Sequence, residues 1–122
     1  MAGEKILLVE DNAVNRRLAG FLLRSQGYQV SEATTAQEAF ELLKTESPDL
    51  IVMDIQLPGK DGLEITKELK DQPATAGIPV IAVTSYAMKG DREKALAAGC
   101  SGYVTKPIDK TIFLAEISRH LK

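Results

Sequence analysis

The sequence predicts an α/β fold, in which five short parallel strands alternate with five helices. Short apolar runs recur along the chain, and most of them have no polar alternation, which is typical of strands buried on both faces. Amphipathic stretches separate these runs, and most of the stretches have a capping residue or a stop signal at one end. A strand followed by a helix, repeated five times, indicates a parallel sheet with right-handed crossovers.

The predicted strands are the apolar runs at residues 6–9, 28–30, 50–53, 80–83 and 102–104. The first predicted helix carries Val14, Leu18, Phe21 and Leu22 on one face, and Gly27 follows as its stop. The second begins with a capping box, "TAQE" at residues 35–38. The other three helices are expected at residues 62–70, at residues 89–98 closed by Gly99, and after the N-cap Asp109.

The length, net charge and cysteine content of the chain limit the classes of function that it can have. A length of 122 residues suits one domain, which we expect to span residues 1–122. Fifteen basic against 17 acidic residues give a net charge of −2, so we expect neither nucleic-acid binding nor attraction to an anionic membrane. The single cysteine, Cys100, cannot form an internal disulfide and is expected to fill a small apolar gap. A cytoplasmic location is the simplest assignment.

Polar residues follow the predicted strands at the ends that meet on one edge of a parallel sheet. Glu10 and Asp11 follow the first strand, and Asp54 ends the third. Carboxylates brought together without compensation repel one another and raise one another's pKa values. A bound cation would neutralise this repulsion. Ligands that are all oxygen favour Mg²⁺, with Mn²⁺ as a substitute.

Lys106 follows the fifth strand and would lie beside the cation. Because two positive charges repel, its position suggests that an anion also binds at this edge. A phosphoryl group would bridge Mg²⁺ and the ammonium group, while the hydroxyl of Thr84 and a backbone N–H from the next loop donate to its oxygens. Asp54 is the better candidate nucleophile because it ends the central strand, "LIVMD". Glu10 and Asp11, one strand away, are placed to hold the ion.

Four motifs at these strand ends resemble the receiver domains of two-component response regulators. They are "VEDN" at 9–12, "DLIVMDIQLPGKDG" at 49–62, "IPVIAVTSYA" at 78–87 and "GYVTKPI" at 102–108. The sequence is most similar to single-domain regulators of the DivK type and to the receivers of hybrid histidine kinases. The resemblance implies a doubly wound, flavodoxin-like sheet with strand order 2-1-3-4-5 and helices on both faces.

The resemblance also implies the site. Asp54 would accept a phosphoryl group from a phosphohistidine, giving an acyl phosphate, with Lys106 and Thr84 contacting the phosphoryl oxygens. The implied metal ligands are Asp11, Asp54, the backbone carbonyl of Gln56 and, through water, Glu10.

Further roles follow from the same likeness. Thr84 and Tyr103 would form the switch that changes the surface of the fourth helix and fifth strand. Gln56 and Tyr86 match positions that tune dephosphorylation, and the Lys106–Pro107 bond is expected to be cis.

The partners implied are a histidine kinase or histidine phosphotransfer protein and a downstream protein target, with no enzymatic activity beyond the chain's own phosphotransfer and dephosphorylation. A receiver module excised from a hybrid kinase and a docking pseudo-receiver that is never phosphorylated stay open as alternatives. A flavodoxin-like electron carrier is disfavoured because the acidic "EDN" would repel its phosphate. A small-molecule phosphatase is disfavoured because the first strand lacks the Asp-x-Asp pair of that class. Arg16 and Arg17, on the first helix, could face a partner helix.

Overall fold

A five-stranded parallel sheet forms the centre of the molecule in the computed structural model, which describes residues 3–55, 57, 61–84 and 90–121. The strand order is β2-β1-β3-β4-β5, which confirms the predicted topology. The strands are β1 (Lys5–Val9), β2 (Gln29–Ala33), β3 (Leu50–Asp54), β4 (Val80–Thr84) and β5 (Gly102–Thr105). Since β3 lies between β1 and β4 and is buried along its whole length, its last residue reaches the middle of the sheet edge.

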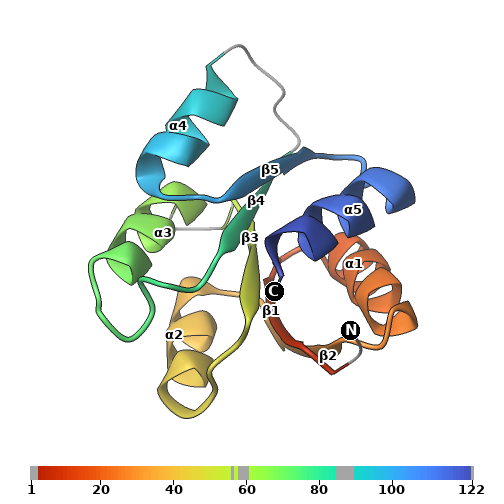
Figure 1. Cartoon of the computed structure of the whole chain (residues 1–122), viewed down its shortest axis with the longest axis horizontal. Helices are drawn as coiled ribbons and strands as arrows, with labels where there is room; N and C mark the ends of the chain where they lie inside the picture. Colours follow the sequence, from red (N-terminus) through yellow and green to blue (C-terminus); the bar gives the residue numbers. More distant parts are fainter. Residues whose placement is uncertain (1–2, 56, 58–60, 85–89, 122) are drawn as a thin grey trace.

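Helices cover both faces of this sheet. Those in the described part of the chain are α1 (Ala13–Ser25), α2 (Ala36–Thr45), α3 (Gly62–Lys70), α4 (Asp91–Ala98) and α5 (Lys110–His120). Figure 1 shows α1 and α5 side by side on one face of the sheet, with α2, α3 and α4 on the other. None of the helices in the described ranges combines the length and the apolar character that a membrane span requires.

The core has two layers, one on each side of the sheet. Alternate residues of β1 serve the two layers: Ile6 and Leu8 pack on the side of α1 and α5, and Leu7 and Val9 pack on the side of α2, α3 and α4. Because the three central strands β1, β3 and β4 are covered on both faces, apolar residues stand at consecutive positions in them. Cys100 is buried in the second layer, as predicted, with its Sγ 3.9 Å from the hydroxyl of Thr66.

The prediction for the second strand was wrong by several residues. The apolar run 28–30 suggested a short strand, but β2 extends from Gln29 to Ala33 and includes Ser31 and Glu32. The physical reason is its position at the edge of the sheet, where side chains are partly exposed and polar residues are tolerated. For the fourth helix, the structure describes α4 from Asp91, and the predicted start at Lys89 lies outside the described residues.

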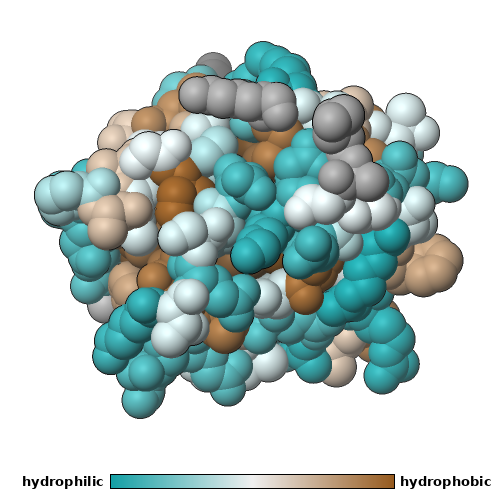
Figure 2. All heavy atoms as spheres, turned by 60° about the horizontal axis from the view of Figure 1, so that its bottom comes forward, coloured by the Kyte–Doolittle hydropathy of each residue, from teal (hydrophilic) through white to brown (hydrophobic). Residues whose placement is uncertain are grey.

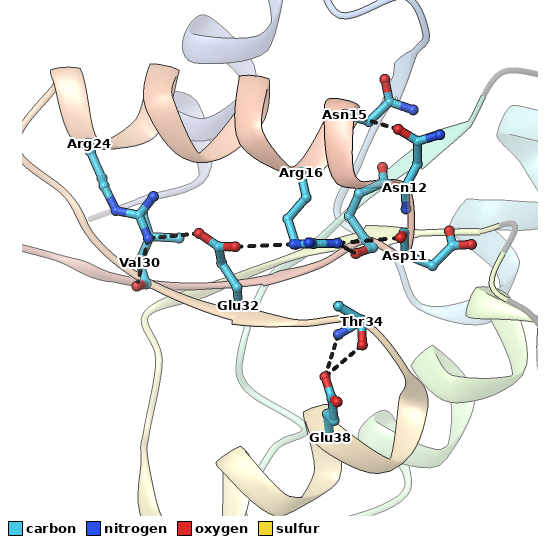
Figure 3. Close-up of polar contacts among 10 residues, drawn as sticks. Asp11, Asn12, Asn15, Arg16, Arg24, Val30, Glu32, Thr34 and Glu38 are labelled. Atoms are coloured by element: carbon cyan, nitrogen blue, oxygen red, sulfur yellow. Dashed lines mark hydrogen bonds and ion pairs between the residues drawn. The ribbon is translucent and has the colours of Figure 1, made fainter.

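Side-chain caps begin four of the helices. Asn12, Thr35, Asp61 and Asp109 each accept a hydrogen bond from a backbone N–H in the first turn of the helix that follows. The predicted capping box is only half formed. Thr35 accepts from the N–H of Glu38, but the Glu38 carboxylate accepts from the N–H and hydroxyl of Thr34, one residue before the cap (Figure 3).

The apolar face predicted for α1 is not its core face. Leu22 is buried together with Ala19 and Leu23, whereas Val14 and Phe21 are 72% and 68% exposed. Leu18 is also exposed, so three large apolar side chains of α1 face outward. On the face that Figure 2 shows, with the lower side of Figure 1 turned forward, hydrophilic residues predominate and apolar ones form small separate areas.

Candidate functional site

The turn between β1 and α1 places two acidic residues at the edge of the sheet. The N–H of Glu10 donates to the carbonyl of Ala33 at 3.0 Å, which ties the turn to the end of β2. The side chain of Glu10 is buried and accepts from the N–H of Asn12 at 3.2 Å, while Asp11 is exposed. Asn12 then caps α1 through the N–H of Asn15. One carboxylate of the pair therefore points into the protein and the other lies at its surface.

Asp54, at the end of β3, is 2% exposed. Its backbone lies directly against the start of α3. A Cβ on Gly62 would clash with the carbonyl of Asp54 and would lie 2.7 Å from the Cα of Ile55, and the N–H of Gly62 donates to the carbonyl of Ile55 at 2.9 Å. Only glycine permits this approach without a backbone shift. Gly62 thus allows α3 to begin directly behind the acidic site.

β4 and β5 contribute the other two predicted groups. Thr84 is buried at the end of β4, on the strand next to that of Asp54. The N–H of Lys106 donates to the carbonyl of Thr84 at 2.7 Å, which continues the pairing of β4 with β5 by one residue. The Lys106–Pro107 bond is cis, as expected.

The structure brings the acids and the lysine together. Lys106 Nζ lies 2.9 Å from a carboxylate oxygen of Glu10 and 3.4 Å from one of Asp54. Carboxylate oxygens of Glu10, Asp11 and Asp54 all lie within 4.8 Å of one another. The three acids come from two strand ends and the lysine from a third, so only the folded sheet assembles them.

This crowding changes the titration of Glu10. Burial, followed by the neighbouring Asp54 carboxylate, raises the pKa of Glu10 from 4.5 to about 7. The Lys106 ammonium group and the N–H of Asn12 act in the opposite direction, but they do not outweigh burial and the second carboxylate. The site in this form therefore holds more negative charge than one lysine can compensate.

The donor atoms fit a small hard cation. Three ionised carboxylates and one ammonium group leave a formal charge of −2 among these described residues, which a divalent ion would neutralise. Carboxylate oxygens are the ligands that Mg²⁺ and Mn²⁺ prefer, and the exposed Asp11 leaves room for coordinated water. The predicted metal ligands Glu10, Asp11 and Asp54 are thus suitably grouped for such an ion.

Comparison with known proteins agrees with this arrangement. The family model "response regulator receiver domain" matches residues 6–118. The chain belongs to the response regulator receiver domain family. It is also 44% identical over 118 residues to the polar-differentiation response regulator DivK of Brucella ovis, covering 97% of this chain and 96% of that protein.

Solved receiver structures share its fold. The receiver domain of the sensor histidine kinase PA1611 from Pseudomonas aeruginosa is 38% identical, with a TM-score of 0.87 and 97% of each chain covered, and it has a magnesium ion coordinated in its active site cleft. The chemotaxis protein CheY4 of Vibrio cholerae is 26% identical, with a TM-score of 0.91 over 98% of this chain and 100% of that one.

The other predicted site residues of this receiver are only partly described. Tyr103 is half-buried on β5, pairs in register with Ala82 and packs against the core layer on the side of α2, α3 and α4. Gln56 and Tyr86 lie outside the described residues, so the predicted carbonyl ligand and both tuning positions stay predictions.

Sequence reasoning missed the role of Arg16. Its Nη1 donates to the backbone carbonyls of Glu10 and Asp11, and its Nε donates to the Glu32 carboxylate (Figure 3). One signal was present, because a basic residue near a helix N-terminus opposes the helix dipole and suggests a specific acceptor nearby. Arg17, in contrast, is exposed, and its expected contact with a partner helix stays a prediction.

Proposed function

We propose that this receiver accepts a phosphoryl group from a phosphohistidine on the carboxylate of Asp54 and transmits the change to a protein partner. The observation that carries the proposal is the position of Lys106 Nζ, in contact with the carboxylates of both Glu10 and Asp54. A lysine between two acids, beside a third, suits a site that binds a cation and an anion together.

Each residue has a role in the transfer. An oxygen of Asp54 attacks phosphorus, the bond from phosphorus to the donor imidazole breaks, and an acyl phosphate forms. Lys106 turns from the carboxylates to the phosphoryl oxygens, and the Thr84 hydroxyl donates to another of them. As in phosphoryl transfer generally, the protein mainly positions groups and balances charge.

Mg²⁺ is the proposed cofactor, with Mn²⁺ as a substitute. Asp11 and Asp54 would bind it directly and Glu10 through water, together with the predicted carbonyl of Gln56. When bound, the ion neutralises the carboxylates so that a phosphoryl group can approach them. Support comes from the grouped carboxylates here and from the magnesium-bound PA1611 receiver.

The proposed donor is a histidine kinase or a histidine phosphotransfer protein, and the proposed output is docking of the α4 and β5 surface to a downstream protein. Beyond its own phosphotransfer and dephosphorylation we assign the chain no enzymatic activity. Histidine kinases draw on ATP, so the proposed location is the cytoplasm. The proposal treats residues 1–122 as one receiver domain, whether it stands alone or belongs to a hybrid kinase.

The test is incubation with Mg²⁺ and acetyl phosphate, followed by intact mass measurement. The wild type should gain one phosphoryl group, and Asp54→Ala should gain none. Asp71→Asn is the matched control, because Asp71 is an exposed carboxylate at the far end of α3. Removal of Mg²⁺ with EDTA should prevent the gain.

Two outcomes would contradict the proposal. Phosphorylation that persists in Asp54→Ala would place the acceptor elsewhere. A wild type that stays unmodified with both acetyl phosphate and a panel of phosphorylated histidine kinases would instead favour the docking pseudo-receiver.

A further inference from the structure

Arg16 connects the acidic turn to the neighbouring strand. Its Nη1 lies 3.2 Å from the carbonyl oxygen of Glu10 and 3.3 Å from that of Asp11, and its Nε lies 3.2 Å from Oε1 of Glu32 on β2. The Arg16 side chain is only 22% exposed. In Figure 3 it extends from α1 between the Glu32 carboxylate and the turn that carries Asp11. One guanidinium group thus holds both acidic residues by their backbone.

Glu32 is itself held in place. Its second oxygen accepts from Arg24 Nη2 at 2.8 Å, so two arginines of α1 share one carboxylate of β2. Gly20 makes room for this pairing, since a Cβ there would lie 2.9 Å from Arg24 Nη1 and 3.4 Å from the second Glu32 oxygen. The Glu32 carboxylate is therefore a fixed anchor for Arg16.

The contacts act just beyond the strand pairing, where the N–H of Glu10 still donates to the carbonyl of Ala33 on β2. The pairing of β1 with β3 ends at Val9, and Glu10 and Asp11 follow in the turn. A flexible turn would let the exposed Asp11 carboxylate move away from that of Asp54. The guanidinium group, with its planar and rigid fork of donors, can hold two carbonyls and a carboxylate at once, which the ammonium group of a lysine does less well.

We propose that Arg16 is a positioning residue for the magnesium site: it orders the turn of Glu10 and Asp11 and thereby raises the affinity for the ion. The proposal rests on the proposed function. It opposes a simple electrostatic expectation, because a positive side chain near a cation site should weaken cation binding. The removal of Arg16 should therefore lower the Mg²⁺ affinity if Arg16 acts by positioning the turn, and raise it if Arg16 acts only through its charge.

The test is Mg²⁺ binding to the full chain by isothermal titration calorimetry. Arg16→Ala should weaken binding by about tenfold or more, as is usual for groups that orient metal ligands. Arg17→Ala is the matched control: it removes the same charge from the next position, and Arg17 makes no hydrogen bond or ion pair within the described part of the chain. It should leave the affinity unchanged or slightly higher, and Arg16→Lys should not restore the loss.

A second readout separates positioning from a general loss of structure. At saturating Mg²⁺, Arg16→Ala should be phosphorylated by acetyl phosphate at nearly the wild-type rate, whereas below saturation it should be slower. Urea unfolding in EDTA measures the stability of each variant without the ion. A lower rate at every Mg²⁺ concentration would overturn the proposal, as would unchanged or tighter Mg²⁺ binding by Arg16→Ala.

If Arg16→Ala does not fold, Glu32→Gln provides the test, because it removes the anchor and keeps the arginine. Its control is Glu41→Gln on α2, because Glu41 and Glu32 line one surface groove and, within the described residues, Glu41 pairs with Lys44 and not with Arg16 or the acidic turn. Only Glu32→Gln should weaken Mg²⁺ binding, and equal affinities would overturn the proposal. A wild type that binds no Mg²⁺ would instead contradict the proposed function itself.

Discussion

Glu10 shows how burial and charge are balanced at this site. The side chain is 3% exposed and touches Lys106, yet its pKa is raised to about 7 because burial and the Asp54 carboxylate disfavour ionisation. In the unfolded chain the same group titrates near 4.5. Between these two values the folded protein binds more protons at Glu10 than the unfolded chain does. Stability must therefore fall as the pH rises through this window.

We expect metal-free wild type to lose stability relative to Glu10→Gln between about pH 4.5 and 7, by on the order of 3 kcal/mol at most. Urea unfolding in EDTA at intervals across this range measures the difference. Saturating Mg²⁺ should reduce the loss, because the ion binds the ionised carboxylates. A pH-independent difference between the two proteins would contradict the raised pKa.

Arg16 and Arg17 show the limit of sequence reasoning for single residues. The two arginines are adjacent on α1 and look equivalent in the sequence, but one turns toward the acidic turn and the other to solvent. The difference depends on the position of Glu32 on β2, which only the packing of α1 against the sheet determines.

At the scale of elements, α1 combines a buried and an exposed apolar face. Leu22 and Leu23 pack in the core, whereas Val14, Leu18 and Phe21 line a small surface groove together with Arg17. Large apolar side chains grouped at the surface often mark a docking site. Since α1 begins directly after the turn of Glu10 and Asp11, a partner bound to this groove would contact the helix that follows the acidic turn.

We therefore expect Phe21→Ser to slow phosphotransfer from a phosphorylated histidine kinase or phosphotransfer protein by about tenfold, a loss of about 1.4 kcal/mol. Transfer from acetyl phosphate should be unaffected, because a small donor needs no docking surface. Leu96→Ser, which removes an exposed apolar side chain of α4 on the opposite face of the sheet, is the control. Equal effects of Phe21→Ser on both donors would argue against docking at α1.

At the scale of the whole molecule, the order of the strands brings the predicted switch residues onto the two strands that follow that of Asp54 in the sheet. Asp54, Thr84 and Tyr103 stand on β3, β4 and β5, which are consecutive neighbours in the sheet. Tyr103 is half-buried against the core layer that includes α4. A movement of Thr84 toward a phosphoryl group would vacate space that the Tyr103 ring could enter, in a two-state change selected by the phosphate.

We expect the NMR signals of the Tyr103 ring to change when Mg²⁺ and beryllium fluoride, a phosphoryl mimic, are added to the wild type. Thr84→Val, which keeps the shape but removes the hydroxyl, should bind Mg²⁺ normally and show a smaller change at Tyr103. An identical ring environment with and without the mimic would contradict this route.

Much of the fold could be predicted from local patterns. Buried strands appear in the sequence as apolar runs because both faces are covered. The caps Thr35 and Asp109 mark helix starts because their side chains accept hydrogen bonds from nearby N–H groups. β2 was misjudged because an edge strand tolerates polar residues, and α1 because its most regular apolar face is its exposed one. The grouping of Glu10, Asp54 and Lys106 could be predicted because residues that follow parallel strands meet at one edge.

By itself the sequence determined the α/β class and most element positions, because helix periodicity, capping and strand burial depend on neighbours along the chain. It also predicted the grouping of the acids with Lys106, because residues that follow parallel strands meet at one edge of the sheet. The tertiary structure decided which apolar face of α1 is covered, that Glu10 is buried against Asp54 and Lys106, and that Arg16 holds the acidic turn. These features depend on distances between segments far apart in sequence, which are set only when the helices pack against the sheet.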